Sequence, residues 1–383
     1  MMNDNRRTLT GHRDTDWIIT AKIDNHNLMQ LCIASPNLWF YNDENFWKRR
    51  IYRRFRTVQK SDGKTWKTFF LQLVHFNSYV RYSDRIMNAA KYGHQDVAET
   101  IINNSSRDEK EKQRFYNWGL YGSLISKKWN LINYFIERGA KGWNRALYYV
   151  GKNGDMNMIN FVIEKGATAW NLGLSGASRG GHIDIMNYFI SRGANRFNSS
   201  LYDAALGENQ NVIDYLISLG ADNWNRGLEG ATEKENLELV NFFIEKGADE
   251  FRYSLLKAAV KKNQVLIDLF LQKGADPMCG LNGAIQINNQ ELIDYFISCG
   301  ANDWELAMSI SIDSKNLRLV QFFADKGAND WERSMFHSTN LGSLNLVQFF
   351  ADKGAKDWNL CLGVASNDRV KQFFQKKIAE ANH

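Results

Sequence analysis

Proline and cysteine are both scarce in this sequence. Its 383 residues include two prolines, Pro36 and Pro277, and four cysteines. Because proline interrupts helices, so few prolines are typical of a mostly helical chain. The cysteines form no Cys-x-x-Cys pair and no Cys/His cluster at the spacing of a zinc site, so we expect reduced thiols in an intracellular protein: Cys32, Cys279, Cys299 and Cys361.

Long hydrophobic runs are also absent. No stretch approaches the roughly 20 apolar residues of a membrane span. The first residues, MMNDNRRTLTGHRDTD, contain no apolar signal core. We therefore expect a cytoplasmic or nuclear protein without membrane contact. The formal net charge of +6 is small for this length and does not by itself favour nucleic acid as a partner.

No motif of a known catalytic chemistry stands in a suitable context. The sequence has no glycine-rich phosphate loop, zincin motif, nucleophile elbow or pair of catalytic acids in such a setting. The repeats described next also leave little chain from which an active site could be built. We therefore expect a protein that is not an enzyme and that holds no cofactor and no metal.

What the sequence does contain is a regular repeat. A Gly-Ala pair follows an aromatic and aliphatic run again and again, as in FIEKGADE at 243–250. The glycines of these pairs are spaced by 27 residues, with a single spacing of 26: Gly139, Gly166, Gly193, Gly220, Gly247, Gly274, Gly300, Gly327 and Gly354. A fixed period in this size range indicates a solenoid of stacked repeats.

Each repeat predicts two short helices. Counting back from the glycine, apolar residues at positions −8, −7, −4 and −3 form one face of a second helix. A first helix carries a small residue at −20, leucine or methionine at −19, and mostly alanine or serine at −16, a pattern that allows close helix packing. The glycine suits the left-handed conformation that ends a helix. We predict an all-α helix-turn-helix solenoid.

This repeat resembles the ankyrin repeat. The matching pattern is L-x-x-A-x-x-x-G-H, seen as LSGA at 174–177 with GH at 181–182, followed by an apolar helix and Gly-Ala. Ankyrin units are usually about 33 residues long, with a hairpin finger between them. This unit is shorter and lacks the TPLH tetrad. The resemblance implies about eleven repeats over 82–375 with few or no fingers, followed by a charged tail at 376–383.

Residues 1–80 do not share the period and resemble a degenerate F-box. That family is a small helical module which docks on the adaptor subunit of a cullin-type ubiquitin ligase. The match is carried by LMQLC at 28–32 and NFWK at 45–48, although the opening Leu-Pro of the family is missing. An F-box-like module ahead of helical repeats is similar to proteins of large DNA viruses of amoebae. The resemblance implies adaptor contacts at Leu28, Leu31, Pro36, Phe46 and Trp47. The simpler alternative is a helical cap.

The variable positions of the first helix are −21, −18, −17 and −14. Since −20, −19 and −16 belong to the core, these four positions are predicted to face outward. A uniform core with a varied surface is typical of a recognition array. The candidate partner-binding residues are Arg145, Tyr148, Tyr149, Lys152, Arg226, Glu229, Glu233, Tyr253, Lys257, Arg333, Phe336 and His337.

Two repeated columns have both a structural and a functional interpretation. An aromatic residue, mostly tryptophan, opens nearly every first helix, and we expect it to seal the short connection and pack on the next repeat rather than to stack on a ligand. A lysine or arginine precedes most of the closing glycines. We expect it to complement the helix dipole rather than to form a stripe for a polyanion.

The strongest basic run is KRRIYRRFR at 48–56, continuing to Lys60, Lys64 and Lys67. Interleaved aromatic residues make RNA binding an alternative, whereas Ile51 and Phe55 suggest an amphipathic helix with a basic outer face. We expect a monomeric, non-enzymatic scaffold for protein partners. If the F-box resemblance holds, the chain is an adaptor that brings a target to a ubiquitin ligase. The alternative is a basic solenoid that binds nucleic acid or another polyanion.

Overall fold

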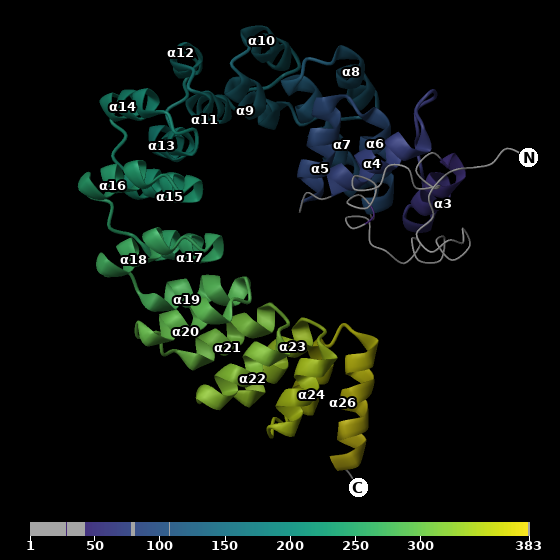
Figure 1. Cartoon of the computed structure of the whole chain (residues 1–383), viewed down its shortest axis with the longest axis vertical. Helices are drawn as coiled ribbons and strands as arrows, with labels where there is room; N and C mark the ends of the chain where they lie inside the picture. The colour runs from purple at the N-terminus through teal and green to yellow at the C-terminus, as the bar shows by residue number, and fades with distance from the viewer. Residues whose placement is uncertain (1–27, 29–42, 78–80, 107, 382–383) are drawn as a thin grey trace, which may run out of the picture. The chain divides into compact units, whose positions relative to one another are not determined.

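The computed structural model describes residues 28, 43–77, 81–106 and 108–381. Within these residues the chain is all-helical, with helices α3 to α26 in succession and no strand (Figure 1). The predicted all-α helical repeat architecture is therefore confirmed, and the described connections contain no hairpin finger. Backbone contacts divide the chain into two compact units, residues 1–196 (unit 1) and 197–383 (unit 2).

Unit 1 contains α3 to α12, and unit 2 contains α13 to α26. The helices of unit 1 are α3 (Glu44–Arg54), α4 (Trp66–Asn77), α5 (Tyr82–Tyr92), α6 (Gln95–Ser105), α7 (Glu109–Ile125), α8 (Trp129–Glu137), α9 (Trp143–Asn153), α10 (Met156–Glu164), α11 (Trp170–Gly180) and α12 (Ile183–Ser191). Those of unit 2 are α13 (Phe197–Leu206), α14 (Gln210–Ser218), α15 (Trp224–Lys234), α16 (Leu237–Glu245), α17 (Arg252–Lys261), α18 (Gln264–Gln272), α19 (Pro277–Gln286), α20 (Gln290–Ser298), α21 (Trp304–Asp313), α22 (Leu317–Lys326), α23 (Trp331–Asn340), α24 (Leu344–Asp352), α25 (Trp358–Val364) and α26 (Asp368–Ala381).

Within a repeat, a phenylalanine of the second helix packs on the small residue of the first. Phe243 of α16 is fully buried, and its ring fills the place where a side chain on Gly227 of α15 would lie. The same contact joins Phe189 to Gly173 in unit 1. Position −20 is small because the ring at −4 needs that space, and the ring in return removes a large apolar area from water.

The closing glycine ends the second helix as predicted. Gly247 has φ +109°, in the left-handed region, and the corresponding glycines of the other repeats also have positive φ. The Ala248 amide donates to the Phe243 carbonyl at 2.9 Å, and the Gly247 amide donates to Ile244 at 3.0 Å. This six-to-one bond together with the bond from the glycine is a Schellman ending, which satisfies carbonyls that the last helical turn leaves open.

An asparagine in the first helix holds the short connection to the next repeat. Asn144 Oδ1 of α9 accepts hydrogen bonds from the backbone amides of Thr168 at 2.8 Å and Ala169 at 3.1 Å, in the connection that closes the same repeat. Equivalent clamps hold most of the other short connections: Asn117, Asn171, Asn198, Asn225, Glu305 and Glu332. We call this contact the connection clamp. It explains why tryptophan is followed by asparagine or glutamate at most helix starts.

First helices also pack on one another in pairs. In α19, a Cβ on Gly283 would lie 2.5 Å from the Leu256 carbonyl oxygen of α17, and Gly122, Gly176 and Gly230 lie closer still to the preceding first helix. All four occupy position −17, in every second repeat up to α19. The close pairs are α5 with α7 and α9 with α11 in unit 1 (Figure 1), and α13 with α15 and α17 with α19 in unit 2.

Two predictions need correction. Packing on the next repeat was expected for the opening aromatic ring, but its ring contacts are with a phenylalanine of its own repeat: Trp304 stacks on Phe323 at 6.3 Å between ring centroids. Residues 376–381 are not a separate tail, since they form the last turns of α26. The division between a module at 1–80 and repeats at 82–375 stays a prediction.

Candidate partner-binding surface

All twelve predicted surface residues retain exposed area in the structure. Arg145, Lys152, Tyr253 and Arg333 are exposed, and the other eight are half-buried. The outward assignment of position −17 is nevertheless wrong in every second repeat up to α19, where the residue is one of the buried glycines at the close helix pairs. Where position −17 has a side chain, as in Tyr149, Lys257 and His337, that side chain contacts the preceding first helix.

In unit 1, aromatic rings gather on two consecutive first helices, α7 and α9. Tyr121 of α7 and Tyr149 of α9 stack with ring centroids 4.9 Å apart. Trp118 of α7 meets both rings edge-on at 5.4 and 6.2 Å, and Tyr148 of α9 lies edge-on to Tyr149 at 5.3 Å. Offset and edge-to-face contacts of this kind hold rings in fixed positions. Tyr121 is buried, while the other three rings keep part of their area exposed.

Two arginines border this aromatic cluster. The guanidinium of Arg145 lies 5.1 Å from the centre of the Trp118 ring, and Arg179 of α11 donates a hydrogen bond of 2.9 Å to the Tyr148 hydroxyl. We call the six residues Trp118, Tyr121, Arg145, Tyr148, Tyr149 and Arg179 the aromatic–arginine patch. The sequence prediction named three of them. The other three, Trp118, Tyr121 and Arg179, stand at the same outward positions of neighbouring repeats, which the candidate residues did not include.

Tyr121 and Tyr149 stay uncharged at neutral pH. Burial raises the pKa of Tyr121 to about 12. Burial also raises the pKa of Tyr149, although the hydrogen bond from Arg145 works in the opposite direction. The hydroxyls therefore remain hydrogen-bond donors and add no negative charge to the cationic surface.

Several charged residues on the corresponding surface of unit 2 pair with one another. Arg226 pairs with Glu229 on α15, and Lys257 Nζ lies 3.3 Å from Glu233 Oε2 between α17 and α15. His337 Nε2 of α23 lies 2.8 Å from Asp313 Oδ1 of α21. Arg226 and Glu229 therefore satisfy one another within α15, and the other two pairs join neighbouring first helices.

A cavity of about 260 Å³ lies between α21 and α23 and is lined partly by Arg333 and His337. Its carboxylates already have structural roles. Asp303 accepts from the Leu306 amide at 3.0 Å as a helix cap, and Glu305 forms a connection clamp. A second, more open hollow at the start of α15 is likewise lined by cap and clamp residues. Neither hollow combines apolar depth with uncommitted polar groups.

The predicted adaptor contacts lie inside the N-terminal module where they are described. Leu28 and Trp47 are fully buried, and Phe46 is 2% exposed. The Trp47 ring packs on Phe46 and on Phe70 of α4, each at 5.0 Å between centroids. Leu31 and Pro36 lie outside the described residues. In this structure the side chains of Leu28, Phe46 and Trp47 thus stabilise the module and present no surface to a partner.

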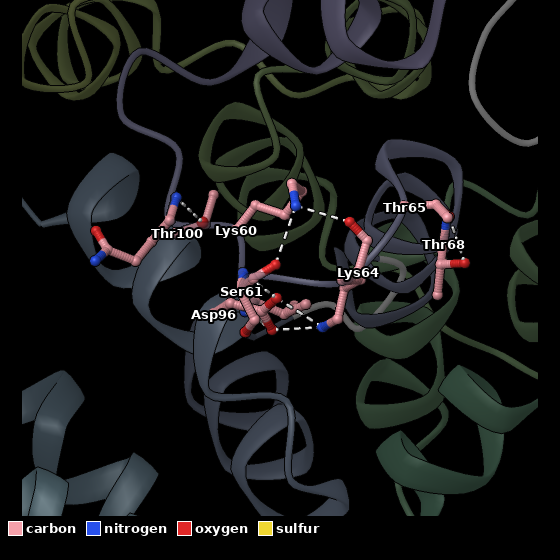
Figure 2. A network of polar contacts seen from close by, with 9 residues as sticks. Lys60, Ser61, Lys64, Thr65, Thr68, Asp96 and Thr100 are labelled. Carbon is pink, nitrogen blue, oxygen red and sulfur yellow. Dashed lines mark hydrogen bonds and ion pairs between the residues drawn. The ribbon is translucent and has the colours of Figure 1, made fainter. Parts of the chain in front are cut away.

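The basic segment after α3 is bound to the first repeat. The buried carboxylate of Asp96 in α6 accepts from Lys64 Nζ at 2.7 Å and from the Ser61 amide at 3.1 Å, while Lys60 turns back to the Ser61 and Lys64 carbonyls (Figure 2). The Gln59 amide donates to Thr100 at 3.0 Å. Burial acts to raise the pKa of Asp96, but the contacts with Lys64 and Ser61 outweigh it and hold that pKa below its usual value.

No protein-family model matches this sequence, and a search of curated proteins finds none with significant similarity to it. Among the residues that the structure describes, no helix has the length and apolar character needed to cross a bilayer.

Proposed function

We propose that this chain is a non-enzymatic protein-binding scaffold whose first helices carry the recognition surface. One observation carries the proposal: the residues that repeat have contacts within the fold, and most of the residues that vary keep exposed area. The closing glycine, the phenylalanine at −4 and the connection clamp all have structural contacts. The varied outward positions of the first helices are left to bind partners, which is how repeat arrays recognise proteins.

The finer proposal is an ankyrin-like substrate adaptor for a cullin-type ubiquitin ligase. Its support is the F-box-like pattern of residues 28–48, together with the attachment of the following segment to α6 by Lys64 and Asp96. The module would join the ligase in the cytoplasm or nucleus of a eukaryotic cell while the repeats hold the target. The chain would perform no chemistry of its own.

A pull-down from a eukaryotic lysate tests the adaptor function. The full chain is expected to recover cullin-ligase subunits, and Leu31→Ala with Pro36→Ala is expected to abolish that recovery. Substituting Trp47 is unsuitable here, because removing a fully buried indole would unfold the module. Arg145→Gln on the repeat surface is the control and should leave recovery of the ligase unchanged. A folded bait that recovers no ligase subunit would exclude the adaptor function and leave the scaffold in place.

The contacts of Lys60 and Lys64, two bases of the run that begins at residue 48, weigh against a polyanion-binding function. Lys64 is paired with Asp96, and Lys60 donates to two backbone carbonyls. A nucleic-acid-binding surface needs cations directed toward phosphates, and its affinity falls steeply with salt. Binding of single-stranded DNA that falls steeply between about 50 and 200 mM salt would restore this alternative.

A further inference from the structure

The cavity between α21 and α23 is bordered by three acids that have no cationic partner. Asp303 and Asp330 cap the N-termini of these two helices, and Glu305 forms a connection clamp. One oxygen of each carboxylate accepts backbone amides: Asp303 Oδ1, Asp330 Oδ1 and Glu305 Oε1. The second oxygen of each makes no hydrogen bond or ion pair among the residues that the structure describes. The cap and clamp roles therefore use only part of what these carboxylates can accept.

A buried hydroxyl without a partner also lines this cavity. Ser334 of α23 is 6% exposed, and its hydroxyl forms no hydrogen bond in the described part of the chain. Ser200 and Ser254 stand at the same position of other repeats, where they are fully buried. The cavity thus reaches a polar side chain that packing covers in those repeats. Buried polar groups without a partner are uncommon, and a group that enters from the cavity would satisfy this one.

The charge of the cavity favours a positively charged group. Its lining carries three carboxylates and one guanidinium, that of Arg333. His337 also lines it and is already held by Asp313 at 2.8 Å. No three acidic, histidine or cysteine side chains in the described ranges are grouped as metal ligands. The spacing of the acids therefore suits an organic cation with several N–H donors better than a metal ion.

The size of the cavity favours a single side chain. Its volume of about 260 Å³ lies below the roughly 300 to 1,000 Å³ of pockets that enclose a small molecule. Leu306 is the only apolar side chain in the lining and is 47% exposed. The methylene stem of a lysine or arginine can lie on such a residue while its charged end reaches the carboxylates.

We propose that the cavity between α21 and α23 receives a basic side chain, lysine or arginine, of a partner protein. The second oxygens of Asp303, Glu305 and Asp330 accept from its charged end. Leu306 contacts its stem, and the Ser334 hydroxyl accepts a further hydrogen bond. This inference rests on the proposed scaffold function and adds the chemical class of the residue that the scaffold recognises. It assigns recognition to α21 and α23 of unit 2.

Selection from a display library of random peptides tests the inference on the full chain. Retained peptides are expected to be enriched in Lys and Arg over the starting library, although the net charge of +6 attracts acidic peptides. Asp330→Asn with Glu305→Gln should remove that enrichment and weaken a selected peptide about tenfold or more in fluorescence anisotropy. Both substitutions remove a charge but keep the oxygen that accepts the cap or clamp bond.

The matched control changes a cap and a clamp outside the cavity. It is Asp276→Asn with Glu332→Gln, at the start of α19 and in α23, and it should bind the selected peptide as the unmodified chain does. Ser334→Ala is a second test variant, because its hydroxyl makes no bond that the fold needs. It should weaken the peptide about threefold. All variants should keep the melting temperature of the unmodified chain.

The alternative outcomes separate this inference from the scaffold function. Enriched peptides without a basic bias, or basic peptides bound equally by the Asp330→Asn and Glu305→Gln variant, would overturn the basic-residue assignment while the scaffold stands. The same holds if Ser334→Ala binds the peptide as tightly as the unmodified chain, or if the small cation spermidine binds as tightly as the peptide. If no peptide is enriched by any form of the chain, both proposals fail.

Discussion

At the scale of single residues, the most consequential buried charge is Asp96. It is 4% exposed, and its partner Lys64 is 17% exposed. Replacing one member of such a pair leaves the other partly desolvated and unpaired, which costs far more than the pair itself contributes. We expect Asp96→Asn to lower the free energy of unfolding by about 2 to 4 kcal/mol in urea denaturation. Asp62→Asn, an exposed acid in the same segment, is the control and should change it by less than about 0.5 kcal/mol.

The same pair predicts a dependence on pH. The pKa of Asp96 is lower in the folded chain than in the unfolded one, so its contribution is complete above the unfolded value near 3.8. That contribution is lost as the pH falls through the lower, folded value. Melting temperatures measured from about pH 5 downward should therefore fall more for the unmodified chain than for Asp96→Asn. Parallel curves for the two proteins would show that the carboxylate is not held by Lys64.

The connection clamp gives a second prediction at this scale. Asn144→Ala leaves two amides of a short connection without their acceptor, and we expect it to lower the unfolding free energy by about 1 to 2 kcal/mol. Asn153→Ala, at the exposed end of the same helix, should be neutral or slightly stabilising. Asn144→Glu should keep most of the stability that Asn144→Ala loses, because Glu305 and Glu332 make the same contact in later repeats.

At the scale of elements, replacing a glycine of the close helix pairs by alanine should lower stability, whereas the same substitution inside a helix usually raises it. Gly→Ala inside a helix normally stabilises by about 0.5 to 1 kcal/mol. At Gly176 the added methyl would collide with the Tyr148 carbonyl of α9, so we expect Gly176→Ala to destabilise by about 1 to 3 kcal/mol. Gly363 of α25 has no neighbour within 4 Å of the same methyl, and Gly363→Ala should stabilise. Urea denaturation measures the change in unfolding free energy for both variants. Equal changes for Gly176→Ala and Gly363→Ala would contradict the close pairing of α9 with α11.

The two helices of each repeat could be predicted from the sequence because the same pattern of residues recurs in every repeat. The closing glycine, the apolar face of the second helix and the small residue at −20 appear in register, and the structure places them as expected. The packing between first helices could not be predicted in the same way. Its signal is a glycine at −17 in alternate repeats, and a pattern derived from one repeat at a time treats that position as variable.

The candidate surface was predicted less completely for a related physical reason. Helical geometry fixes which positions of one helix face outward, and it correctly marked Arg145 and Tyr149. It does not say which neighbouring helix supplies the next side chain. The contact of Tyr121 with Tyr149 and that of Arg179 with Tyr148 join different repeats, so they require the spacing of the stacked helices. The burial of Trp47 likewise depends on α4, which a motif match does not include.

At the scale of the whole molecule, stability is expected to be local. Each repeat contacts mainly its neighbours, so a defect should weaken nearby repeats without unfolding the whole chain. Phe350→Ala removes a fully buried ring from α24 and should cost about 3 to 5 kcal/mol there. In hydrogen exchange, amides of α23 to α26 should lose protection while those of α5 to α10 keep theirs. Phe349→Ala, at a half-buried neighbour, is the control, and a uniform loss of protection would contradict local stability.

The alternating glycines also limit how such a chain can lengthen or shorten over evolutionary time. Duplicating a single repeat between α9 and α11 would place either two glycine-bearing helices or two side-chain-bearing helices in succession. A duplicated pair would instead restore the alternation at both junctions. Up to α19, we therefore expect repeats to be duplicated or deleted in pairs. Beyond α19, position −17 holds Ile310 and then His337 in successive repeats, so single repeats can be gained or lost.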